Sequence, residues 1–93
     1  MMDNRKILIV EDEKHITDFL KLRFEQEGLE TICAPTLSAG LDKAGAYHPD
    51  LTILDLGMPD GDGMEFIHTI RKRSHMPIIV LSARFDEMDK VAA

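Results

Sequence analysis

Short runs rich in isoleucine, leucine and valine alternate along the chain with segments of helical spacing, and this alternation limits the fold more than any other feature. Residues 7–10, 51–54 and 77–81 are the apolar runs, and their content is typical of strands buried on both faces of a parallel sheet. Residues 29–34 are more polar, which favours a strand at an edge of the sheet. Strands separated by helices are usually parallel and joined by right-handed crossovers, so the sequence predicts an α/β fold.

The first helix is predicted over residues 14–26, where apolar side chains recur at helical spacing. One stripe faces inward in this prediction, made of Ile16, Phe19, Leu20 and Phe24. Gly28 follows as a natural stop just past the helix.

Two further helices are predicted later in the chain. Thr36 is a candidate N-cap for the second helix, which Gly40 and Gly45 each weaken by about 1 kcal/mol relative to alanine. The third helix is predicted over residues 65–73, and Asp86 is a candidate cap for one more.

Length and composition exclude several classes of protein. The chain has 93 residues, enough for one domain, and its net charge of −6 excludes nucleic-acid binding by bulk electrostatics. The longest fully apolar runs, residues 7–10 and 78–81, have four residues each, so we expect no membrane-spanning helix and no membrane partner. The single cysteine excludes an internal disulfide and suits a reducing compartment, which favours a cytoplasmic location.

Polar residues stand at the ends of three predicted strands. Glu11 and Asp12 follow the first strand, Asp55 follows the third and Ser82 follows the fourth. Ligands of parallel α/β sheets bind beyond the carboxyl ends of the strands, near the point where the strand order reverses. If the first and third strands are neighbours, three carboxylates converge at one crevice.

A cluster of three carboxylates needs a cation or a proton to be tolerated. Two unit charges about 4 Å apart repel by about 4 kcal/mol at an effective dielectric constant of 20. A site made only of oxygen ligands, with room for water and phosphate oxygens, favours Mg²⁺. The sequence therefore makes Mg²⁺ the expected cofactor.

Each of these residues also has an interpretation without function. Glu11 and Asp12 could form a solvated turn in which Asp12 caps the following helix, and Ser82 could satisfy a local backbone group. Asp55 is harder to explain in this way, because aspartate is depleted in strands and a charge there needs a partner. A dinucleotide site of the glycine-rich type is disfavoured, since acidic residues occupy the turn after the first strand.

The segment Asp-Leu-Gly-Met-Pro-Asp-Gly-Asp-Gly at residues 55–63 resembles the phosphoacceptor loop of response-regulator receiver domains. The acidic pair after the first strand is similar to the metal-binding pair of that family. The Leu-Ser-Ala sequence at residues 81–83 is similar to the end of its fourth strand. These three motifs occur in the family's order and spacing over the whole chain.

The resemblance implies a role for each matching residue. Asp55 would be the nucleophile that takes phosphate from a phosphohistidine, and Ser82 would hydrogen-bond a phosphate oxygen. Mg²⁺ would be bound by the carboxylates of Asp12 and Asp55 and by the backbone carbonyl of Gly57. Glu11 would act largely through a bound water, and the small Gly63 is expected to permit an unusual backbone path in the loop.

The resemblance also implies the fold and the partners. The expected architecture is a doubly wound, flavodoxin-like parallel sheet of strand order 2-1-3-4, in which the fifth strand and helix are missing. Residues 1–93 would thus form an incomplete receiver domain without an output domain. A sensor histidine kinase is the expected partner, and DNA would be bound only through an absent C-terminal winged-helix domain. The fourth strand would lie at an edge, which favours a homodimer or other association.

Two other functions compete with the phosphoacceptor role. Phosphatases of the haloacid-dehalogenase type also use an aspartate nucleophile with Mg²⁺, but they need a second aspartate two residues later, where Gly57 stands. A degenerate or truncated receiver that acts only as a docking or dimerisation module is the alternative that stays open. In either receiver interpretation the chain is not an enzyme beyond its own phosphorylation and dephosphorylation.

Overall fold

The structure, a computed structural model, describes residues 5–81, which form strands and helices in strict alternation. The strands are β1 (Lys6–Val10), β2 (Glu30–Ala34), β3 (Leu51–Asp55) and β4 (Ile78–Leu81). The helices are α1 (Lys14–Gln26), α2 (Leu37–Tyr47) and α3 (Gly63–Arg71). Ser82 and Asp86, which carried predictions, lie outside the described residues.

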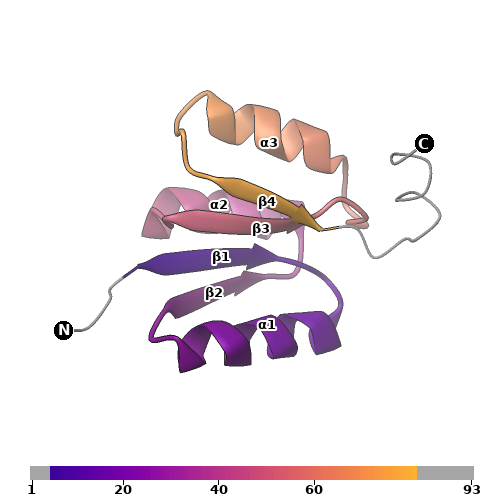
Figure 1. Ribbon diagram of the computed structural model, residues 1–93. Helices are drawn as coiled ribbons and strands as arrows, with labels where there is room; N and C mark the ends of the chain where they lie inside the picture. The colour runs from indigo at the N-terminus through magenta and orange to yellow at the C-terminus, as the bar shows by residue number, and fades with distance from the viewer. Residues whose placement is uncertain (1–4, 82–93) are drawn as a thin grey trace, which may run out of the picture.

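The strands form one parallel sheet of order β2-β1-β3-β4, as expected for a doubly wound, flavodoxin-like fold. Helix α1 covers one face of the sheet, and α2 and α3 cover the other (Figure 1). The predicted edge position of the second strand is confirmed, since β2 is the outermost strand beside β1 and its first residue is exposed. None of the helices within residues 5–81 combines the length and apolar character that a membrane crossing requires.

Alternate residues of the central strands supply the core on the two faces of the sheet. Leu8, Val10 and Leu54 point to the α2 and α3 side, where they pack with Phe66 of α3. On the α1 side the buried residues are Ile7, Ile9 and Ile53. Burying side chains of this kind contributes about 1.5–3 kcal/mol each. The sheet is thus buried on both faces, as its continuously apolar strands predicted.

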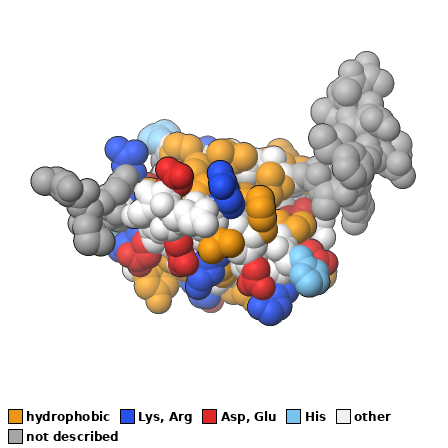
Figure 2. Space-filling view, turned by 60° about the horizontal axis from the view of Figure 1, so that its bottom comes forward, with side chains coloured by type: hydrophobic (Ala, Val, Ile, Leu, Met, Phe, Trp, Pro, Cys, Tyr) orange, Lys and Arg blue, Asp and Glu red, His pale blue; other side chains and the backbone are white. Residues whose placement is uncertain are grey.

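The inward stripe predicted for α1 is wrong at Phe19. Leu20 and Phe24 pack against the sheet, whereas the Phe19 side chain is 62% exposed. Successive helical residues project about 100° apart, so the neighbour of Leu20 is turned away from the sheet. Figure 2 brings forward the side on which α1 lies and shows hydrophobic side chains scattered among charged ones.

The helix boundaries follow from capping side chains. Thr36 caps α2 as predicted, because its Oγ1 accepts a hydrogen bond from the Ala39 N–H at 3.0 Å. The third helix begins at Gly63 rather than at residue 65, because the Asp62 carboxylate accepts from the Met64 N–H at 2.8 Å. The Asp62 cap therefore places the start of α3 about half a turn earlier than predicted.

The two glycines of α2 lie in different surroundings. A Cβ atom on Gly40 would lie 2.9 Å from Val10 Cγ2 and 3.0 Å from Phe66 Cε2, both of which belong to buried side chains. A Cβ atom on Gly45 would meet only Arg73 Nη1, at 3.9 Å. Gly40 is therefore needed for the close packing of α2 on β1 and α3, whereas Gly45 is not.

Alanine substitutions at these two glycines should have opposite effects on stability. Gly45→Ala should stabilise the protein by up to about 1 kcal/mol, because alanine favours the helix and its Cβ atom would make only an ordinary van der Waals contact with Arg73. Gly40→Ala should destabilise it, because overpacking a core costs about 1–3 kcal/mol and outweighs the same helical gain. Urea unfolding of both variants beside the wild type measures this difference, and a stabilised Gly40→Ala would contradict the packing argument.

Candidate metal centre

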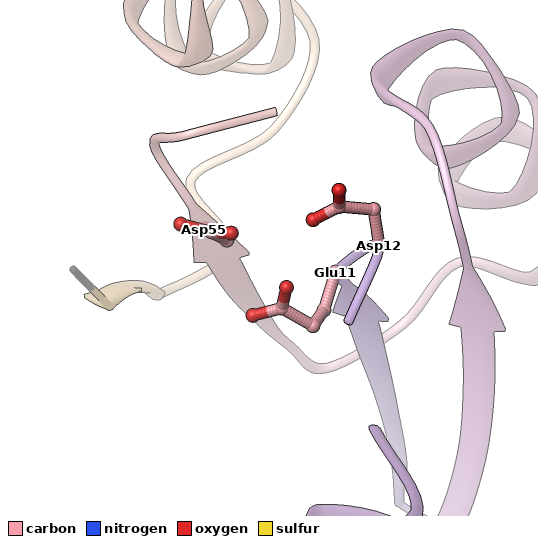
Figure 3. A group of neighbouring side chains, drawn as sticks. All are labelled: Glu11, Asp12 and Asp55. Carbon is pink, nitrogen blue, oxygen red and sulfur yellow. The ribbon is translucent and has the colours of Figure 1, made fainter. Parts of the chain in front are cut away.

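Three carboxylates meet at the carboxyl end of the central strands. β1 and β3 are hydrogen-bonded neighbours with Val10 opposite Leu54, so the residues that follow them, Glu11 and Asp55, stand side by side. Asp12 adds a third carboxylate from the turn after β1 (Figure 3). One oxygen of each side chain lies within 4.8 Å of the others. The convergence predicted from the strand ends is confirmed.

The cluster is buried on one side and open on the other. Glu11 is 4% exposed and Asp55 is 7% exposed, whereas Asp12 is exposed. Glu11 Oε2 accepts a hydrogen bond from the Glu13 N–H at 3.0 Å, and Asp55 Oδ1 accepts one from the Gly57 N–H at 2.9 Å. Each buried carboxylate is thus oriented by one backbone donor and keeps a second oxygen for a ligand.

The electrostatics of this cluster shift the protonation of Glu11. Burial of the carboxyl group, which is the largest cause, and the neighbouring Asp55 and Asp12 carboxyl groups together raise the Glu11 pKa to about 7, against the lowering effect of the Glu13 N–H. A carboxyl group with this pKa holds a proton for part of the time near neutral pH. The site therefore favours either that proton or a cation.

The donor set fits Mg²⁺. All three side chains offer carboxylate oxygens, which are the hard ligands that Mg²⁺ prefers. The exposed position of Asp12 leaves the outer side of the cluster open to water and to an anionic ligand. Mg²⁺ usually keeps several such outer ligands, so a site with few protein ligands suits it.

The interpretation of Asp12 as a helix cap is wrong. Glu13 is the N-cap of α1, and its side chain accepts from the His15 N–H at 3.3 Å. Asp12 instead belongs to the carboxylate group at the sheet edge.

The loop after β3 differs from expectation in the role of Gly63. Its backbone was expected to follow an unusual path, but Gly63 begins α3. A Cβ atom there would lie 2.7 Å from Leu56 Cδ2 and 3.3 Å from Leu56 Cα, so glycine permits close approach to the preceding loop. Met58 is buried at 6% exposure and fixes the middle of the loop.

One contact in this loop was missed by the sequence analysis. The Asp60 carboxylate accepts hydrogen bonds from the backbone of Leu37 and Ser38 at the start of α2. Asp60 stands between a proline and a glycine, a setting that indicates only a turn. Nothing in the local sequence shows a partner more than twenty residues earlier.

Comparison with known proteins defines the class. The sequence matches the response regulator receiver domain family over residues 7–93. The receiver domain of Francisella response regulator 1452 superposes with a TM-score of 0.80 at 31% identity, covering 96% of this chain and 74% of that one. A CheY-like response regulator receiver domain protein from Methanospirillum hungatei JF-1 superposes with a TM-score of 0.83 at 32% identity, covering 88% of this chain and 66% of that one.

The chain therefore belongs to the family of response regulator receiver domains, as its motifs indicated. Among curated proteins it is 54% identical over 87 residues to the KDP operon transcriptional regulatory protein KdpE of Escherichia coli (strain K12). That alignment covers 94% of this chain and 39% of the relative.

The Glu11 contribution to the stability of the metal-free protein should decline between pH 4.5 and about pH 7. The unfolded chain releases the Glu11 proton near its ordinary pKa of 4.5, whereas the folded protein holds it up to a pKa of about 7. The contribution is complete below this window, falls as pH rises through it and is level above it. The loss is at most about 3 kcal/mol, and urea unfolding in a chelator across this pH range measures it.

The matched control is Glu11→Gln, which cannot titrate but can still accept the Glu13 N–H bond. The variant should gain stability relative to the wild type as pH rises through the same window. Saturating Mg²⁺ should reduce the pH dependence of the wild type. A stability difference that stays constant with pH would contradict the assignment.

Proposed function

We propose that Asp55 accepts a phosphoryl group from a phosphohistidine on a sensor histidine kinase, giving an aspartyl phosphate. The observation that carries this proposal is the position of the Asp55 carboxylate at the end of buried β3, grouped with Glu11 and Asp12. A carboxylate oxygen attacks phosphorus, the new O–P bond forms, and the N–P bond breaks with its electrons returning to the imidazole. Transfer of this kind depends on positioning and charge stabilisation more than on covalent machinery.

Mg²⁺ is the proposed cofactor. The carboxylates of Asp12 and Asp55 and the backbone carbonyl of Gly57 would bind it, and Glu11 would act through water. When bound, the metal supplies positive charge to the equatorial phosphoryl oxygens. The Gly57 N–H bond to Asp55 Oδ1 orients the carboxylate and supports the assignment of the other oxygen as nucleophile. Ser82 is proposed to hydrogen-bond the phosphoryl group and lies outside the described residues.

The biological role proposed for the whole protein is transcriptional control. The curated relative is described as a transcriptional regulatory protein of the KDP operon, and the chain covers 39% of its length. We propose that phosphorylation here governs DNA binding by a separate output domain, and that the receiver turns over no substrate besides its own phosphate. The free Cys33 suits a cytoplasmic location.

Asp55→Asn should abolish phosphorylation. Asparagine keeps the shape of the side chain but lacks the nucleophilic carboxylate, so incubation with acetyl phosphate and Mg²⁺ should add no phosphoryl group. Intact-mass spectrometry measures the product, which in the wild type should also require Mg²⁺. Asp42→Asn is the matched control, because the Asp42 side chain is exposed on α2 and makes no hydrogen bond or ion pair among residues 5–81. Equal labelling of Asp55→Asn and the wild type would refute the proposal.

The docking-module alternative makes a different prediction. Beryllofluoride mimics an aspartyl phosphate, so a switching receiver should show backbone amide shifts in its NMR spectrum that are lost in Asp55→Asn. A pure docking module should bind its partner equally well in both forms and show no such shifts.

We also propose that the 93-residue chain self-associates through β4. This strand lies at the edge of the described sheet, and the side chains of Ile79 and Val80 are 50% and 43% exposed. Exposed apolar edges favour pairing with another chain. Light scattering should therefore report a dimer or larger species that Ile79→Lys reduces. Phe19→Lys, which removes an exposed apolar side chain from α1, is the control and should leave association unchanged.

A further inference from the structure

The carboxylate of Asp60 joins the loop after β3 to the start of α2. Its Oδ1 accepts a hydrogen bond from the Leu37 N–H at 2.9 Å, and its Oδ2 accepts one from the Ser38 N–H at 3.1 Å. These two residues are the first of α2, and they precede Asp60 by 23 and 22 positions. One side chain thus bridges two segments that the sequence separates widely.

The bridge completes the capping of α2. The first four N–H groups of a helix have no partner within the helix. In α2 the third N–H, of Ala39, donates to Thr36 Oγ1, and the fourth N–H, of Gly40, donates to the Thr36 carbonyl. The first two N–H groups, of Leu37 and Ser38, are left for Asp60. The Leu37 N–H and, more weakly, the Ser38 N–H lower the Asp60 pKa, so this carboxyl group is ionised at neutral pH. A carboxylate also interacts favourably with the positive end of a helix.

Helix α2 is itself held in place by close packing on its neighbours. Gly40 brings it so close to β1 and α3 that a single added Cβ atom would lie 2.9 Å from Val10 Cγ2. The other fixed points of the loop are the buried Met58 and the Asp62 cap of α3. Asp60 lies between them and three residues after Gly57, so its two hydrogen bonds set how the loop lies against α2.

We propose that Asp60 is a positioning residue for the metal site, which holds the loop through the N-terminus of α2 so that Gly57 stays in place for Mg²⁺. This inference rests on the proposed function, in which the Gly57 carbonyl is a metal ligand. Groups that orient metal ligands commonly change metal affinity when they are removed, although they never touch the ion. Loss of the Asp60 bridge should therefore weaken Mg²⁺ binding.

The test compares three substitutions by calorimetric Mg²⁺ titration. Asp60→Ala removes both hydrogen bonds and should weaken Mg²⁺ binding by about tenfold. Asp60→Asn removes the same charge but keeps one acceptor oxygen, so its affinity should lie between those of Asp60→Ala and the wild type. Thr36→Ala removes the other side-chain cap of α2 without touching the loop, and it should lower the thermal midpoint while leaving Mg²⁺ affinity within about twofold of the wild type.

Each other outcome overturns the inference for a distinct reason. Equal losses in Asp60→Ala and Asp60→Asn would assign the effect to charge alone, and an equal loss in Thr36→Ala would assign it to α2 stability. Unchanged Mg²⁺ affinity in Asp60→Ala would show that the bridge has no role in the site. If the wild type binds no Mg²⁺, the metal assignment itself fails and the inference falls with it, which separates that failure from the others.

Discussion

The parallel pairing of β1 with β3 is the constraint on which the site depends. It places the residues after two separate strands at one edge of the sheet, so Glu11 and Asp55 are neighbours although they lie far apart in the sequence. The strand order reverses between these two strands, which is where α/β sheets bind their ligands. The apolar side chains of β1 and β3 hold the pairing, because they are buried on both faces of the sheet.

The same pairing brings negatively charged groups close together at the edge of the sheet. Three carboxylates converge, and within residues 5–81 the backbone offers one hydrogen-bond donor each to Glu11 and Asp55. Burial, together with the neighbouring carboxyl groups, raises the pKa of Glu11 as a result. A bound cation would relieve this crowding of negative charge and, under the proposed function, would also offset the negative charge of an incoming phosphoryl group.

Much of the fold was predictable because its signals are local and repeated. The strands, the first two helices and the Thr36 cap follow from residue periodicity and capping chemistry that act within a few positions. The errors arise where packing between neighbouring elements decides which side chain is buried or small. Phe19 has the right spacing for burial but is turned away from the sheet, and Gly63 is small because Leu56 packs against it.

By itself the sequence determined the chemistry of this protein, since it supplied an acidic pair after one buried strand, an aspartate after another and a loop resembling those of receiver domains. The ends of buried strands can be predicted from local sequence patterns, and carboxylates are uncommon at such positions unless they have a partner. The tertiary structure alone decided the distances among the carboxylates, the protonation of Glu11 and the bridge from Asp60 to α2. These depend on burial and on contacts between segments more than twenty residues apart, which no local pattern encodes.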